Sequence, residues 1–277
     1  MLRMLGYAAN QLDRLRFALA AERAALQVDE PVRCDGWGVG SYQSGELLLR
    51  RRPSDARETL RLPELLVSLR TSCAMAHLRH ATAGGHTLEN THPFRFRQWL
   101  FAAVGTLPNF PEKRAALREV IPGFIALNIR GETDSELLFH RLLAAVHAQG
   151  HLDDPEYPRT DLLEALRDGL RGVDTTLGAR APMAFLVSNG SLLVGVRRGA
   201  PLAYVRRLGL RDGDQLRAKN PDLLGSEGRK VHLESFRYVF LASGGAPGSP
   251  GWSEVPEEPD GSALVVDAKL ELHHHAL

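Results

Sequence analysis

The chain contains two thiols, Cys34 and Cys73, and they are the first candidates for nucleophilic chemistry because a thiolate attacks carbonyl carbon readily. Cys34 adjoins the segment Asp35–Gly38, but nothing in the sequence gives it a base partner. Cys73 precedes Arg79 on a predicted strand by about 20 Å, at ~3.3 Å per residue. We therefore expect both to be small buried hydrophobic residues, with Cys34 the better candidate for an unusual nucleophile.

The histidines are the side chains that could bind a metal. The run His273–His275 is typical of a metal-binding tract, but adjacent residues diverge on a strand, so we expect a frayed polar terminus. His77, His80 and His86 have no cysteine or paired carboxylates nearby to complete a site. The sequence predicts no metal site and no cofactor.

Composition limits the class of partner. The 277 residues are 44% hydrophobic with a net charge of +1, so we expect a large core and no nucleic-acid footprint. The run Arg50–Arg52 is expected to be a solvated turn between strands. No window approaches the roughly 18 apolar residues of a membrane span, and no signal peptide is visible. Together with the two cysteines, which form no disulfide framework, these features predict a cytoplasmic protein without membrane contact.

Hydrophobic periodicity predicts helices that alternate with groups of strands. Helices are expected over residues 10–26, 111–120, 133–149 and 161–173. Strands are expected over residues 2–8, 31–42, 46–49, 67–77, 184–188, 192–197, 202–206, 231–242 and 262–267. Asn10 should cap the first helix, Thr133 and Glu136 should form a capping box, and Asp212-Gly213 should be a turn. This order predicts a layered α+β fold.

Five segments, taken in order, resemble the class II glutamine amidotransferases. They are Met1–Tyr7, Asp35–Gly40, His77–Thr82, Asn90–Phe94 and Gly131–Glu136. Later segments are similar to stand-alone, gamma-glutamyl hydrolase-like members, so the resemblance covers essentially the whole chain. It implies a four-layer αββα sandwich of the N-terminal nucleophile (Ntn) hydrolase type, in a single domain of residues 1–277. No synthetase or isomerase domain is expected to receive ammonia.

The resemblance also implies that the catalytic machinery is degenerate. In the family the second residue is a cysteine whose thiolate attacks the glutamine amide and whose α-amine relays the proton. Here that position is Leu2, which can do neither. The family's oxyanion donors, an asparagine amide and the next glycine N–H, match Val104 and Gly105. Losing one such donor typically costs roughly 10²–10³ in rate, so we expect no glutaminase activity.

The ligand-binding residues of the family are largely retained. The resemblance matches Arg79 to the arginine that holds the α-carboxylate of glutamine, a bidentate task that suits a guanidinium. It matches Asp134 to the carboxylate that pairs with the α-ammonium, and Thr82, Gly38 and His92 to positions that line or brace the pocket. Structural roles remain open, because Arg79 could pair with a structural carboxylate and Asp134 could stabilise a helix N-terminus by about 0.3–1 kcal/mol.

Three hypotheses follow. The first is an amidotransferase-like protein without glutaminase activity that binds a glutamine, glutamate or γ-glutamyl ligand, or a protein partner. The second is an active amidohydrolase with a non-standard nucleophile, which would form a covalent adduct with a glutamine-analogue electrophile. The third is a purely structural interaction subunit that binds no such ligand.

Overall fold

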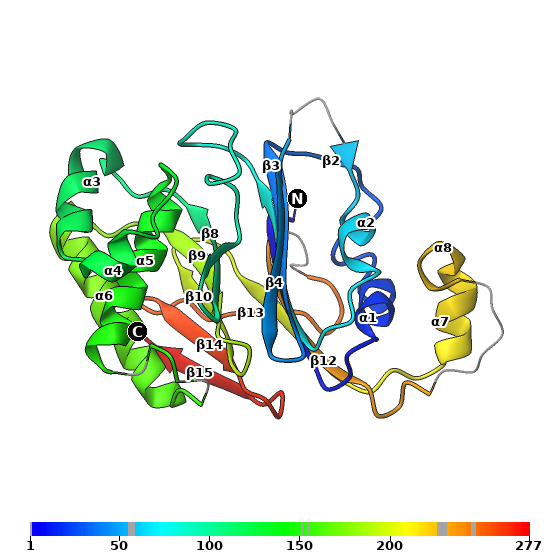
Figure 1. Ribbon diagram of the computed structural model, residues 1–277. Coiled ribbons are helices and arrows are strands. Elements are labelled where there is room, and N and C mark those ends of the chain that lie inside the picture. Colours follow the sequence, from blue (N-terminus) through cyan, green and yellow to red (C-terminus); the bar gives the residue numbers. More distant parts are fainter. Residues whose placement is uncertain (1, 55–58, 151, 155, 226–231, 245–247) are drawn as a thin grey trace.

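Two β-sheets lie face to face at the centre of the molecule, and helices cover the outer face of each (Figure 1). The paired strands within the sheets run antiparallel. The structure is a computed structural model that describes residues 2–54, 59–150, 152–154, 156–225, 232–244 and 248–277. The predicted four-layer αββα sandwich of the α+β class is confirmed.

The first sheet has seven strands and contains the N-terminal strand near its middle. In spatial order they are β13 (Ser253–Glu254), β11 (Ala203–Leu208), β12 (Arg237–Ser243), β1 (Met4–Ala9), β6 (Cys73–Arg79), β3 (Gly36–Gln43) and β4 (Glu46–Pro53). The second sheet has six strands. They are β15 (Leu272–Ala276), β14 (Ser262–Val266), β10 (Leu193–Arg198), β9 (Met183–Ser188), β8 (Trp99–Gly105) and β7 (Phe94–Phe96). A small ladder pairs β2 (Val32–Arg33) with β5 (Thr59–Leu60).

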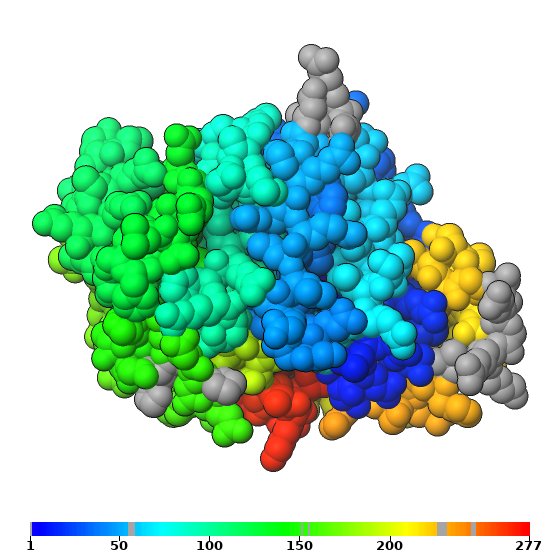
Figure 2. All heavy atoms as spheres, viewed as in Figure 1, coloured from blue at the N-terminus to red at the C-terminus, as the bar shows by residue number. Residues whose placement is uncertain are grey.

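The helices form two groups, one on each side of the paired sheets (Figure 1). The six-stranded sheet is covered by α3 (Phe110–Glu119), α4 (Gly123–Ala126), α5 (Asp134–Ala148) and α6 (Arg159–Leu177). The seven-stranded sheet is covered by α1 (Leu15–Ala21) and α2 (Leu62–Leu66). A further pair, α7 (Gly213–Lys219) and α8 (Pro221–Leu224), packs on α1 and lies at the surface, in yellow in Figure 2.

Apolar side chains fill all three spaces between the four layers. Strand alternation explains how one strand serves two of them, because successive side chains point to opposite faces. In β1, Leu5 and Tyr7 pack against the α1 layer, while Met4 packs between the sheets. Gly6 also faces the second sheet, where an added Cβ would lie 2.9 Å from Leu186 Cδ1. The N-terminal segment is therefore held on both faces.

Local patterns misplaced the start of one helix and of one strand. The helix expected over residues 10–26 begins at Leu15, and Leu12 is 56% exposed. Asn10 does not cap it, because its side chain bonds the carbonyl oxygen of Ser235 and the N–H of Arg237. The strand expected over residues 67–77 begins only at Cys73, and α2 precedes it.

Other polar segments were assigned to the wrong structure. The run Arg50–Arg52 is part of β4 rather than a turn, and Arg50 lies over the Trp37 ring and donates to the carbonyl oxygen of Leu65. Asp212-Gly213 begins α7 rather than forming a hairpin turn. The run His273–His275 is not frayed, because it forms β15 and pairs with β14. Backbone pairing outweighs side-chain polarity in each strand.

The remaining element predictions are close to the observed bounds. The helices expected over residues 111–120, 133–149 and 161–173 are confirmed within a few residues, and the strands expected over 31–42 and 46–49 pair with each other. Val231, where one strand was expected to begin, lies outside the described residues, and β12 begins at Arg237. Within the described part of the chain, no helix is both long and apolar enough to cross a membrane.

Candidate functional site

A cavity of about 110 Å³ opens where β6 and β8 end beside the N-terminus of α5. The strand ends and the loops that follow them supply its walls. Its described lining consists of Arg3, residues 77–83, His92, residues 103–106 and residues 133–135. Five stretches of the chain that are separated in the sequence therefore meet at one small space.

Arg79 is the last residue of β6, and its side chain is held in place by the loop that follows. Its Nη2 donates to the carbonyl oxygens of Ala83 at 2.8 Å and Gly84 at 3.1 Å. The residue is 3% exposed, and its Nη1 has no hydrogen-bond partner among the described residues. Burial lowers the pKa of the guanidinium, and the Asp35 carboxylate opposes that shift. Arg79 is thus a buried cation with donor capacity left over.

Asp35 fixes the segment that carries Arg79. Its backbone N–H donates to the carbonyl oxygen of Arg79, and its Oδ2 accepts from the N–H of Ala81 at 2.7 Å. The loop therefore turns tightly as it leaves β6. Thr82 comes next on this turn, and its Oγ1 lies 3.2 Å from Oγ1 of Thr106 across the cavity mouth.

Asp134 begins α5 and faces the cavity. Its Oδ2 accepts from the N–H of Leu107 at 2.7 Å, and its Oδ1 accepts from the N–H of Ser135 at 2.8 Å and from the Ser135 hydroxyl at 3.3 Å. Burial raises the pKa of this carboxyl, and these hydrogen bonds oppose the shift. The preceding residue, Thr133, accepts from the N–H of Glu136 as predicted. The reciprocal half of the capping box is wrong, because the Glu136 carboxylate accepts from the N–H groups of residues 130 and 131.

Two imidazoles in tilted contact form the inner wall. The rings of His77 and His92 have centroids 4.1 Å apart. His77 Nε2 lies 3.1 Å from the carbonyl oxygen of Ala103, so the neutral ring donates there. Burial lowers the pKa of His77 to about 3 and the pKa of His92 well below its usual value. Both rings are therefore neutral near pH 7 and carry no positive charge into the cavity.

Gly38 braces this wall from the neighbouring strand. It pairs with His77 in the β3–β6 ladder, and an added Cβ would collide with the carbonyl oxygen of His92. A glycine is required there because the backbone of residue 92 crosses the strand too closely for a side chain.

The structure brings most of the predicted site residues together. Arg79, Thr82, His92, Val104, Gly105 and Asp134 all line the cavity. Leu2 does not line it, and its side chain packs at 5% exposure in the core beneath α1. Both cysteines are buried outside the lining, and burial raises the pKa of Cys73 to about 11 and that of Cys34 above its usual value.

The polar lining residues that were not predicted as site residues are Arg3, His77, His80, Thr106, Thr133 and Ser135. His77 had a usable signal, because it stands two residues before Arg79 and a strand places such pairs on one face. Ser135 follows Asp134 directly and donates to it. Within the described residues, no group of three or more histidines, cysteines or carboxylates is arranged to hold a metal ion.

The αββα sandwich with a cavity at the ends of its central strands defines an Ntn-type amidotransferase architecture. The sequence profile described as "Glutamine amidotransferases class-II" matches residues 1–216. The chain belongs to this family.

The similar proteins include relatives that are longer than the matched region. Glutamine--fructose-6-phosphate aminotransferase [isomerizing] of Aquifex aeolicus is 29% identical over 221 residues, which cover 78% of this chain and 32% of that protein. The chain thus spans about a third of that relative's length. A putative glutamine amidotransferase of Haemophilus influenzae is 23% identical, with 75% of this chain and 69% of that protein covered.

Solved structures share the fold over nearly the full length. A predicted glutamine amidotransferase from Pseudomonas aeruginosa PA01 matches with a TM-score of 0.59 and 21% identity, covering 98% of both chains. A glutamine aminotransferase class-II domain protein from Silicibacter pomeroyi matches with a TM-score of 0.55 and 19% identity, covering 99% of this chain and 98% of that one.

Proposed function

We propose that this class II amidotransferase-like protein binds the amino-acid head of glutamine, glutamate or a γ-glutamyl compound and does not hydrolyse glutamine. The observation that carries the proposal is the buried Arg79, whose Nη1 lacks a partner among the described residues, beside Asp134 in one cavity. A buried donor without a partner costs about 1–3 kcal/mol, more when charged, and a ligand carboxylate would remove that cost.

Asp134 supplies the matching negative charge. An ionised carboxylate has about four acceptor positions, and three of those on Asp134 are used by Leu107 and Ser135. The fourth suits an ammonium group. An α-amino acid carries both charges on one carbon, so Arg79 and Asp134 together favour a zwitterionic head over a simple anion.

The same lining supports the proposed lack of glutamine hydrolysis. Its described residues include no cysteine, and the side chain at the expected oxyanion position is the apolar Val104. The neutral imidazole of His77 donates through Nε2 to a backbone carbonyl, and its Nδ1 has no hydrogen-bond partner among the described residues, so His77 forms no nucleophile–base pair. Leu2, which the resemblance matches to the family's nucleophile, packs in the core.

Isothermal titration with glutamine, glutamate and a γ-glutamyl dipeptide tests the binding. We expect Arg79→Ala and Asp134→Ala each to weaken binding at least tenfold, which is about 1.4 kcal/mol. Arg130→Ala, an exposed arginine outside the lining, serves as the matched control and should bind normally. If none of these ligands binds measurably, the result would contradict the proposal and favour the interaction-subunit hypothesis.

A glutaminase assay tests the missing chemistry separately. We expect no ammonia release from glutamine and no adduct with a glutamine-analogue electrophile by intact mass. Ammonia release that Arg79→Ala abolishes would overturn this half of the proposal and favour the active amidohydrolase.

A further inference from the structure

A second cavity, of about 500 Å³, lies at the same end of the six-stranded sheet, beyond the start of β9. It is bounded by Arg180 and Pro182 before β9, by Arg198 and Gly199 at the end of β10, and by residues 257–259. It is larger than the 110 Å³ cavity beside Arg79 and falls within the roughly 300–1,000 Å³ of small-molecule sites. Nothing in the proposed glutamine-type site uses it.

Arg198 is the unusual residue of this cavity. It is 2% exposed, and its Nη2 pairs with Oδ2 of Asp174 on α6. Its Nε and Nη1, and Oδ1 of the same Asp174, have no hydrogen-bond partner in the described part of the chain. A buried guanidinium with unmet donors is costly unless something else accepts from it. Arg198 thus resembles Arg79 in the first cavity.

The rim offers both signs of charge. Arg180 and Glu258 are exposed and line the cavity from opposite segments. Glu257 is already engaged, because its Oε1 accepts from the N–H of Gly199 at 2.8 Å and its Oε2 from Arg197 at 3.2 Å. Among the described rim residues, Glu258 is therefore the carboxylate that can accept a hydrogen bond from a ligand. A polyanion would be repelled by these carboxylates, whereas a molecule with one carboxylate and one amine matches them.

We propose that this cavity is a second binding site, for a small zwitterion of amino-acid or dipeptide size. Its carboxylate lies against the exposed guanidinium of Arg180, where the buried charge of Arg198 adds to the attraction, and its ammonium group lies against Glu258. The rings of Pro182 and Pro259 provide rigid apolar walls for the remainder of the molecule. The site is independent of Arg79 and Asp134, so it stands whether or not the first cavity binds glutamine.

The two cavities share a wall, so the test must tell them apart. An added Cβ on Gly105, which lines the first cavity, would lie 2.6 Å from the carbonyl oxygen of Pro182, which lines the second. Backbone amide resonances of Arg180 and Gly199 report the second cavity, and those of Thr82 and Thr106 report the first. The Arg79→Ala variant removes the first site's ligand group and leaves the second intact.

The experiment is a titration of the full chain and of Arg79→Ala, followed by ¹⁵N resonances. The probes are L-alanine and L-alanyl-L-alanine, with N-acetyl-L-alanine and L-alaninamide as analogues that lack one charge each. We expect the amides of Arg180 and Gly199 to shift with the zwitterions in both proteins, and each analogue to bind at least tenfold more weakly. If these resonances do not shift at a zwitterion concentration of about 10 mM, even a site with a millimolar dissociation constant is excluded, and the proposal is overturned.

Variants of exposed residues keep the test independent of folding. Arg180→Ala and Glu258→Gln should each weaken the zwitterions at least fivefold. Arg211→Ala, an exposed arginine between β11 and α7, is the matched control and should not. Equal binding of N-acetyl-L-alanine and L-alanine, or no effect of Glu258→Gln, would show that no amine is recognised and would overturn the proposed ligand class.

Discussion

At the scale of single residues, the most consequential feature is a set of neutral buried histidines. His77, His92 and His140 are each at most 5% exposed. The charged neighbours of His77 are Arg3 and Arg79, which add to burial in lowering its pKa. Its other titratable neighbours, His80 and His92, do not offer a counter-charge. Protonating His77 in the folded protein is therefore strongly unfavourable.

Folding stability should consequently fall on mild acidification. The pKa is lowered to about 3 for His77 and to about 4 for His140, below the ordinary 6.5. As pH falls through 6.5, these histidines bind protons in the unfolded chain but stay neutral in the folded chain. The free energy of unfolding therefore decreases between about pH 6.5 and 4. Each such histidine contributes up to about 1.4 kcal/mol per pH unit. We expect urea unfolding to show this dependence of the unfolding free energy on pH. In His77→Gln the slope should decrease by the amount that corresponds to about one bound proton.

The comparison between variants decides this prediction. Asp134 and Glu136 act in the opposite sense, because burial raises their pKa and the folded state then binds protons first on acidification. The total slope therefore mixes both effects. His232→Gln, at an exposed position, should leave the slope unchanged. If the slope of unfolding free energy against pH is identical in His77→Gln and the wild type, His77 is protonated in the folded protein as readily as in the unfolded chain.

Individual site residues were predictable where a short motif carried them. Arg79 was placed at the end of a strand, and Gly38 within another strand, from sequence alone, and both lie there. The partners of these residues were not predictable. Asp134 accepts from Leu107, which is 27 positions away, and the packing of Leu2 depends on helices that follow it in the chain. Such contacts depend on the assembled layers rather than on local spacing.

At the scale of elements, amphipathic periodicity located the long helices well and the short ones poorly. α5 and α6 bury a continuous apolar face, so their pattern is repeated over several turns. α1 has only seven residues, and its expected cap, Asn10, bonds instead to the segment before β12, more than 220 positions away. β15 was missed because its histidines carry no apolar alternation, although its backbone pairs fully with β14.

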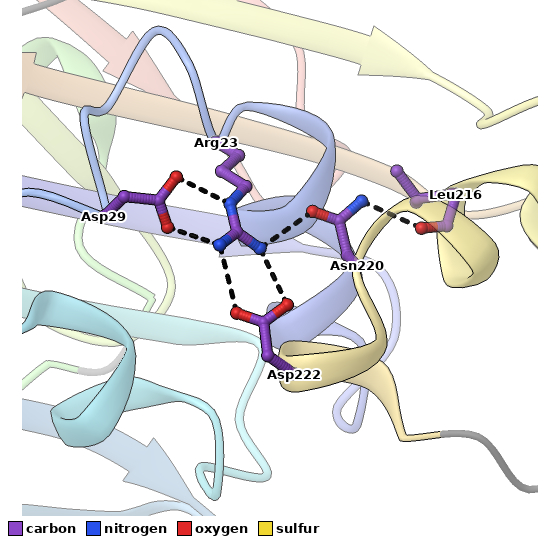
Figure 3. Close-up of polar contacts among 5 residues, drawn as sticks. All are labelled: Arg23, Asp29, Leu216, Asn220 and Asp222. Atoms are coloured by element: carbon purple, nitrogen blue, oxygen red, sulfur yellow. Dashed lines mark hydrogen bonds and ion pairs between the residues drawn. The ribbon is translucent and has the colours of Figure 1, made fainter.

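One arginine makes several polar contacts between the segment that follows α1 and the α7–α8 segment. Arg23, which follows α1, donates through Nε and Nη2 to Asp29, through Nη1 and Nη2 to Asp222, and through Nη1 to Asn220 (Figure 3). Asn220 in turn donates to the carbonyl oxygen of Leu216 at 2.8 Å. α7 buries no residue of its own, so these polar contacts matter more there than in the core.

Removing this arginine should loosen α7–α8 without unfolding the sheets. The ion pairs are solvent-exposed, with Asp29 and Asp222 more than half exposed, so we expect a local effect of about 1 kcal/mol. In Arg23→Ala, hydrogen exchange of amides in α7 and α8 should accelerate about fivefold, while exchange in β1 stays unchanged.

Arg211→Ala is the control for this prediction, because it removes an exposed arginine from the segment that leads into α7. It should leave exchange in α7 and α8 at the wild-type rate. Equal exchange rates in Arg23→Ala and the wild type would mean that the apolar contacts of Leu216 and Leu223 hold the segment by themselves.

At the scale of the whole molecule, the two sheets are joined by an apolar layer in which glycines allow close approach. An added Cβ on Gly40 would lie 2.5 Å from Leu100 Cδ1, and Gly6 meets Leu186 in the same way. The layer also contains Met4, Leu193 and Leu241. Its formation requires strands from both ends of the chain, so we expect the two sheets to fold as one unit.

Tryptophan fluorescence can follow each half of the sandwich during urea unfolding. Trp99 reports the core beneath α5 and α6, whereas Trp37 and Trp252 report the core beneath α1. Variants that keep only Trp99, or only Trp37, should unfold at the same urea concentration, as a two-state transition requires. Separate midpoints would show two independent halves and would refute a single domain.

A substitution that creates a cavity between the sheets should then destabilise both halves equally. Leu186 is fully buried in the central layer, and Leu186→Ala should cost about 2–5 kcal/mol. Leu48→Ala, at a position 50% exposed on β4, should change stability by less than about 0.5 kcal/mol. If Leu186→Ala shifts the Trp99 transition alone, the central layer does not couple the sheets. The cavity beside Arg79 lies where both sheets end, so an equal shift would also mean that its walls are held by the stability of the whole sandwich.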